Sequence, residues 1–318
     1  MPFSLFSGRT RKPVVDPCMG DLAAARLREA MAKGDWRSAG SFLGAVTDPD
    51  DRAFYLDVCS ETTGVQEWIG EWIAAEPGST LALLVKGAHG VRWAWEARGS
   101  ATADHTSAQR FREFHRRLKT AEDCLDEVVE RDPDEVVAWS FLVTSARGRQ
   151  VAPEEAWRRF GEATRRHPAH LRTHLQMLQY LCAKWFGSEE EMFAFARKAA
   201  AAAPPGSPLA LAVVSAHIEQ WLSLDAGEDG DYFDRPDVRG ELRTAADRSV
   251  RHPAFRRRPG WPAGHNALAF AFALGGDHTA AKEQFAAVGD LVTDWPWCYL
   301  GDESTAFAEM RKVSLKYG

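Results

Sequence analysis

A short pattern of small and large apolar residues that ends in proline recurs along this chain. A small residue is followed four positions later by a large apolar residue, three positions later by another apolar residue, and then by proline. Such spacings place the three side chains on one face of an α-helix, and proline stops the helix because it has no N–H to donate. The pattern occurs at Ala156, Phe160, Ala163 and Pro168, at Ala121, Leu125, Val128 and Pro133, and at Ala281, Phe285, Val288 and Pro296.

The spacing of these stops predicts repeated pairs of helices. Pro133 and Pro168 are 35 residues apart, and Pro168 and Pro204 are 36 residues apart. A unit of this length holds two helices, and its small residue lets them approach closely while the larger residue fills the groove to the next pair. Turns between the two helices are expected at 34–36 and 276–278, where glycine suits the end of one helix and aspartate caps the next.

The same patterns, read along the whole chain, divide it into helices, loops and a tail. Residues 1–20 are rich in proline and lack periodicity, so they predict a flexible N-terminal tail before one helical domain at 21–318. Residues 99–106 and 225–236 are rich in Gly, Asp and Ser, which favours loops. The expected helix pairs are 21–33 with 36–46, 50–61 with 64–75, 79–98 with 107–131, 134–147 with 153–166, 169–186 with 188–203, 207–224 with 237–251, and 261–274 with 277–290, before a terminal helix at 303–315.

The repeat motifs resemble those of tetratricopeptide-repeat (TPR) proteins. The resemblance rests on Gly34-Asp35-Trp36 with Ala39, and on Leu268, Ala269 and Phe272 with Gly276-Asp277, Ala281 and Phe285. It implies an all-α fold, a TPR-like α-α superhelix of about seven helical hairpins with a terminal helix. The strings 95–99 and 294–302 also resemble an uncharacterised group of bacterial proteins, which implies fold and bacterial origin but no activity.

Charge and cysteine content narrow the classes of function. The net charge is −6 and the pI is about 6.0, which disfavours binding to nucleic acid or to anionic membranes. The N-terminus does not have the order of a secretory signal, because its apolar residues precede its basic ones. The cysteines form no Cys-x-x-Cys pair, which favours a reducing cytoplasm and no zinc site. They are Cys18, Cys59, Cys124, Cys182 and Cys298.

The segment 89–98 is the first candidate for a functional site. His89, Trp93 and Glu96 fall on one helical face, and Arg98 follows at the helix end before a glycine. An imidazole, an indole, a carboxylate and a guanidinium together can bind a peptide or a small polar ligand. The alternative is structural: the charged pair fixes the loop at 99–106, and the tryptophans pack in the core.

Three further segments are weaker candidates, and each favours a structural role. His170 and His174 have the spacing of two metal ligands, but no third ligand is evident, so exposed histidines at a hairpin junction are expected instead. The acidic stretch 225–237 fails the calcium-loop pattern, because proline stands where glutamate is needed. The basic cluster 251–258 is typical of a solvated loop.

The remaining tryptophans are expected to pack between helices. Trp295 and Trp297 flank a proline and are expected to seal the last hairpin against the terminal helix, since the end of a repeat array exposes an unpaired face. The others that follow helical spacing are Trp36, Trp139, Trp157, Trp185 and Trp221.

Two hypotheses of function follow from these observations. In the first, the chain is an interaction scaffold that binds a peptide or partner protein in a concave groove lined by the first helices of successive pairs. In the second, it is a small-molecule-binding protein or an enzyme with a pocket around His89–Arg98. No known catalytic, nucleotide or metal motif occurs, so no cofactor or metal is expected and a binding protein is favoured over an enzyme.

Overall fold

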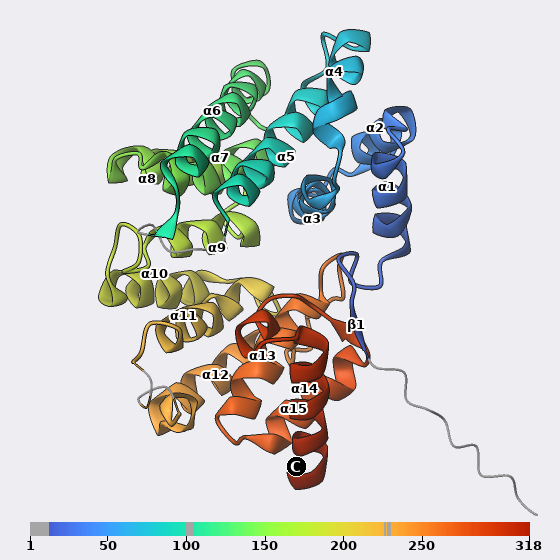
Figure 1. The fold of residues 1–318 in the computed structure, drawn as a ribbon. Coiled ribbons are helices and arrows are strands. Elements are labelled where there is room, and N and C mark those ends of the chain that lie inside the picture. The colour runs from blue at the N-terminus through green and yellow to red at the C-terminus, as the bar shows by residue number, and fades with distance from the viewer. Residues whose placement is uncertain (1–12, 100–104, 226, 228–229) are drawn as a thin grey trace, which may run out of the picture.

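A computed structural model describes residues 13–99, 105–225, 227 and 230–318, and this part of the chain is almost entirely α-helical (Figure 1). None of its helices is both long and apolar enough to span a bilayer. The α-helices are α1 (Leu22–Ala32), α2 (Trp36–Ala45), α3 (Pro49–Glu61), α4 (Val65–Ala75), α5 (Thr80–Arg98), α6 (Ala108–Arg131), α7 (Val136–Arg149), α8 (Pro153–Arg166), α9 (Leu171–Tyr180), α10 (Glu189–Ala202), α11 (Ala212–Trp221), α12 (Pro236–Arg248), α13 (Pro262–Leu274), α14 (His278–Val288) and α15 (Glu303–Tyr317).

These helices match the predicted pairs, and most of their ends lie within three residues of the predicted ones. The predicted helix 169–186 is an exception, because α9 stops at Tyr180 and the chain turns back on itself. Phe186 N–H donates to the Tyr180 carbonyl, and Gly187 lies so close to the backbone of Leu181 that a Cβ there would be 2.2 Å from its oxygen. The predicted helix 207–224 begins instead with a 3-10 turn, η2 (Pro208–Leu211).

The turns inside the hairpins form for the reasons that the sequence suggests. Gly34 and Gly276 adopt φ values of 69° and 67°, a left-handed conformation that glycine reaches without steric cost. Asp35 and Asp277 then cap the following helices, because their side chains accept backbone N–H groups three residues later. These two hairpins therefore carry their own stop and start signals.

Small residues bring paired helices into close contact, most clearly between α5 and α6. Gly90 faces Ala121, and a Cβ added to Gly90 would lie 2.8 Å from the Cβ of Ala121. Gly87 lies equally close to Leu125. These two helices pack along their length, because the absence of a side chain on α5 lets the pattern residues of α6 reach its backbone.

The first helices of successive pairs form one continuous layer. Helix α1 contacts α3, and the contacts continue in order through α5, α7, α9, α11 and α13. The layer curves, so that the N-terminal helices and the C-terminal helices face each other across the molecule (Figure 1). The second helix of most pairs packs on its own first helix, outside this layer.

The N-terminal segment joins the two ends of the curved chain. Val14–Val15 (β1) pairs in parallel with Leu291–Val292 (β2), which lies between α14 and α15. Cys18 is buried, and Gly20 packs on the side chain of Leu291. The flexible tail expected over residues 1–20 is therefore wrong for residues 13–20, because a strand partner that is remote in sequence orders them; residues 1–12 lie outside the described residues.

A second connection between the ends involves the basic cluster at 251–258. The Arg258 guanidinium pairs with Asp48 at 2.6 Å and with Asp51 at 2.8 Å, both at the start of α3. These hydrogen bonds raise the pKa of Arg258 above its usual value. Arg251 pairs with Glu283, and Arg257 stacks on Trp261. Part of the cluster expected to be a solvated loop thus holds the C-terminal half against α3.

The C-terminal end is sealed as the tryptophans predict. Trp297 is fully buried, donates from Nε1 to the Asn266 side chain at 2.8 Å, and packs against Phe285 and Phe307. Trp157 packs between helices, against Phe195 of α10, but it remains 43% exposed. The loop expected at 225–236 contains a 3-10 turn, η3 (Tyr232–Asp234), and two of its side chains, Tyr232 and Phe233, are buried.

The close contact of α5 with α6 yields a test of stability. Gly90→Ala is expected to lower the free energy of unfolding by about 1–2 kcal/mol, because its methyl group overlaps Ala121. Gly161→Ala in α8 is the matched control: no atom lies within 4 Å of its added Cβ, so its greater helix propensity is expected to stabilise by up to about 1 kcal/mol. Urea denaturation measures both, and equal effects at the two positions would contradict the packing described.

Candidate functional site

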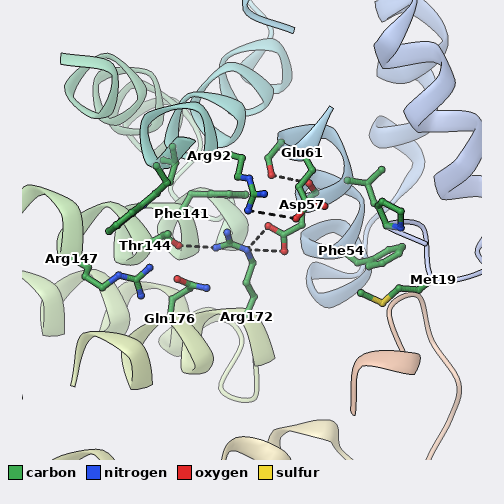
Figure 2. Close-up of a pocket in the computed structure, with 15 residues that line it drawn as sticks. Met19, Phe54, Asp57, Glu61, Arg92, Phe141, Thr144, Arg147, Arg172 and Gln176 are labelled. Carbon is green, nitrogen blue, oxygen red and sulfur yellow. Dashed lines mark hydrogen bonds and ion pairs between the residues drawn. The ribbon is translucent and has the colours of Figure 1, made fainter. Parts of the chain in front are cut away.

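A pocket of about 400 Å³ lies on the layer of first helices, and we call it the central pocket (Figure 2). Its walls come from α3, α5, α7 and α9, and from Pro17 and Met19 in the N-terminal segment. On α3 and α7 the lining residues recur every three or four positions, so one face of each helix points inward. Three arginines and two carboxylates line it: Arg92, Arg147, Arg172, Asp57 and Glu61.

Arg172 is held in place by neighbours on all sides. Its Nε lies 2.9 and 3.1 Å from the two carboxylate oxygens of Asp57. Its Nη1 donates to the hydroxyls of Ser140 and Thr144, both at 3.1 Å, and its guanidinium lies 3.7 Å from the centre of the Phe141 ring. Arg172 therefore connects α9 to α3 and α7 in a fixed orientation, and Asp57 balances its charge.

Arg92 lies at the rim of the central pocket, between two carboxylates. It is half exposed and lies 3.5 Å from Glu96 and 4.0 Å from Glu61. Burial raises the pKa of Glu61 above its usual value, although Arg92 opposes this. The rim thus carries one arginine between two glutamates, so its formal charge is −1 when both are ionised.

Arg147 differs from the other two arginines, because no acidic side chain pairs with it among the described residues. Its Nε and Nη1 atoms are buried and have no hydrogen-bond acceptor. The guanidinium lies 5.0 and 5.3 Å from the ring centres of Trp95 and Trp185. Burial lowers the pKa of Arg147 to about 10, which still leaves it protonated at neutral pH.

Two other polar atoms next to Arg147 also lack partners. Trp95 Nε1 is buried without an acceptor, and Gln176 Oε1 is buried without a donor. Figure 2 shows Arg147 and Gln176 side by side, next to Arg172. A buried polar group without a partner costs roughly 1–3 kcal/mol, so three at one end of a cavity point to a group that the described residues do not supply.

The wall between α3 and α9 is fixed by a network around Asp50. Asp50 accepts from His167 Nε2 at 3.2 Å and from the Leu171 N–H at 3.0 Å. Burial disfavours the charged form of Asp50, but these hydrogen bonds keep its pKa below the usual value. His170 is fully buried beside it and bonds to the Thr173 hydroxyl. The network positions Arg172 opposite Asp57.

The predicted site residues separate on α5 and do not share one cavity. His89 is buried, lies 3.1 Å from the Ser60 carbonyl and 2.8 Å from Gln66 Oε1, and has its pKa lowered by burial. Trp93 packs under Arg117, which lies 3.6 Å from its ring centre. These two residues line a second, smaller hollow of about 170 Å³ between α4, α5 and α6.

Glu96 and Arg98 lie elsewhere. Glu96 is exposed and pairs with Arg92. Arg98 donates to the Gly99 carbonyl and lies beside the rings of Trp95 and Trp185, close to the loop it was expected to fix. Residues 100–104 of that loop lie outside the described residues. His89 and Trp93 thus point toward α4 and α6, while Trp95 lines the central pocket.

The histidine pair at 170 and 174 is buried and not exposed as expected. His170 bonds to Thr173, and His174 bonds to the His170 carbonyl at 2.9 Å and packs against Phe160 and Phe195. In the part of the chain that the structure covers, no three His, Cys, Asp or Glu side chains gather in the arrangement of a metal site.

Sequence reasoning missed the residues of the central pocket, because four helices contribute them. Asp57 and Arg172 are 115 residues apart, and neither belongs to a local motif. One signal was present: arginines at 147 and 172 stand in the first helices of their pairs, each of which packs between two neighbouring first helices. A charge on a helix face that must be buried is a candidate for function.

The burial of His170 predicts a dependence of stability on pH. Its pKa is about 4 in the folded chain and about 6.5 when unfolded, so acid favours the unfolded state. Between pH 7 and pH 5 this residue is expected to lower the free energy of unfolding by roughly 2 kcal/mol. The contribution of His167 to the free energy of unfolding has the opposite sign. Its pKa is raised in the folded chain, so its contribution is present at low pH and is lost as the pH rises. His170→Gln is expected to lose less stability than the wild type over this range in urea titrations, and an equal loss would contradict the assignment.

Comparisons with family models, with curated proteins and with solved structures each found no match for this chain.

Proposed function

We propose that this chain is a TPR-like helical repeat protein that binds a partner in the central pocket on the concave side of its superhelix. The support for the architecture is the order of contacts: each first helix packs on the next, and the second helices lie outside. In such an arrangement the first helices provide the binding face. The central pocket lies on that face.

One observation carries the binding function. At one end of the central pocket, Arg147, Trp95 and Gln176 each hold a buried polar atom without a partner. Folding alone gives no reason to keep three such groups together, because apolar residues of similar size would avoid their cost. A bound molecule that supplies the missing acceptors and donors accounts for all three.

The leading form of this proposal is an interaction protein whose partner inserts a short segment into the central pocket. The mixed lining suits a peptide, since the rings of Phe54 and Phe141 offer apolar contact and the arginines offer polar contact. Five free cysteines fit a protein of the reducing cytoplasm.

A second form is a small-molecule-binding protein, favoured by the size and enclosure of the central pocket. Its volume of about 400 Å³ falls within the range of small-molecule sites. Pro17 and Met19 close one side, which leaves less space for an extended chain than an open groove does. In this form the ligand site lies on the inward face of α5 and not at His89 and Trp93.

A blocked pocket tests the proposed function. Thr144→Phe places a ring in the central pocket, whereas Thr164→Phe places one on α8, at a threonine that makes the same bond to the carbonyl four residues earlier. The full chain is screened by thermal shift against metabolites and by display against random peptides. We expect hits with the wild type and with Thr164→Phe that Thr144→Phe loses.

The outcome distinguishes the two forms. Peptide hits that require an open pocket support the interaction protein, and metabolite hits support the small-molecule form. Hits that both variants retain, or no hit in either screen, would remove the central pocket as the functional site.

A further inference from the structure

We propose that the Arg147 end of the central pocket binds a small organic acid, with one carboxylate on Arg147 and a hydroxyl or amino group beside it. The inference rests on the second, small-molecule form of the proposed function, since it assigns a ligand to the same pocket. It concerns a free small acid and not the end of a partner protein.

The charge of the central pocket favours a single negative charge on the ligand. Asp57 balances Arg172, and Glu61 and Glu96 flank Arg92. Arg147 is the pocket arginine with no carboxylate among the described residues. A monoanion therefore pairs its one charge with the one arginine that lacks a carboxylate, whereas a doubly charged phosphate leaves an excess charge next to Asp57 in a low dielectric.

The unpaired atoms of the three side chains indicate which hydrogen-bonding groups the polar end of the ligand must carry. Nε and Nη1 of Arg147 lie on opposite edges of the guanidinium and each needs its own acceptor, so one carboxylate oxygen can accept from one of them in a charge-assisted hydrogen bond. Trp95 Nε1 is a third unfilled donor at the same end. Gln176 Oε1 needs a donor, which a carboxylate lacks and an adjacent hydroxyl or ammonium group supplies.

The rest of the lining of the central pocket indicates the character of the remainder of the ligand. Phe54, Val58, Val91 and Phe141 contribute apolar lining, so a side chain of aliphatic or aromatic character is expected opposite the polar end. Burial of such a group against this lining supplies affinity that the ion pair alone does not. The ligand class is therefore the α-hydroxy or α-amino monocarboxylates with an apolar side chain.

The test uses the full chain and a panel of such acids, each with its carboxamide. The panel holds the aliphatic and aromatic α-amino acids and the corresponding α-hydroxy acids; inorganic phosphate and pentapeptides that end in the same residues form two further arms. Thermal shift identifies binders, and calorimetry measures Kd. We expect at least one free acid to bind, and its carboxamide to bind at least 100-fold more weakly.

Two substitutions at Arg147 test the role of its guanidinium. Arg147→Met, which keeps an unbranched side chain and removes the charge, is expected to weaken binding of that acid at least 100-fold. Arg147→Lys keeps the charge but loses the planar guanidinium, and is expected to weaken it at least 10-fold. Arg165→Met on α8 is the control, because Arg165 is exposed and remote from the lining of the central pocket.

A second measurement separates a ligand-binding arginine from a structural one. Without ligand, Arg147→Met is expected to unfold at or above the wild-type temperature, because the substitution removes a buried charge that has no partner. A fall of more than about 5 °C would assign Arg147 to the fold and overturn the proposal.

Three other results would overturn the small-acid assignment. Binding of the carboxamides as tightly as the acids, or tighter binding of phosphate or peptides, overturns the small-acid assignment and leaves the proposed function standing. If no acid in the panel binds, the assignment is overturned whether or not other ligands enter the central pocket.

Discussion

Helix α3 is the element on which the arrangement of the whole chain depends, because its acidic side chains hold together segments that are far apart in sequence. Asp48 and Asp51 bind Arg258, Asp50 binds His167, and Asp57 binds Arg172. The carboxylates at the first turn of α3 are also stabilised by the partial positive charge at the N-terminus of the helix. Through these contacts α3 becomes one wall of the central pocket, and α9 becomes the opposite wall.

Almost all charged side chains of the central pocket pair with other side chains of the protein. Arg172 is fixed by Asp57 and two hydroxyls, and such a strut gives the pocket a defined shape before any ligand arrives. Arg147 stands beside it with two nitrogens unpaired. The unpaired cation lowers the stability of the free protein. The preorganised walls lower the entropic cost of binding, because few side chains must be ordered when a ligand enters.

Local signals predicted the hairpins, but not how the chain closes. Glycine at 34 and 276, the aspartates after them and the small residues of each second helix act within one hairpin, so the sequence alone places the helices well. The pairing of Val14 with Leu291 and of Asp51 with Arg258 carries no local signal. His89 and Trp93 were chosen because they share a face, but only packing decides which face of α5 turns inward, and that face carries Trp95.

Small-angle X-ray scattering of the full chain tests the closure of the curved layer most directly. If α3 and the strand pair hold the two ends together, the radius of gyration is expected to be about 20 Å, the value for a compact chain of this length. The double substitution Asp51→Lys with Val15→Lys breaks both connections and is expected to increase it. A wild-type value clearly above about 25 Å, unchanged by that substitution, would show an open ribbon and contradict the enclosed pocket.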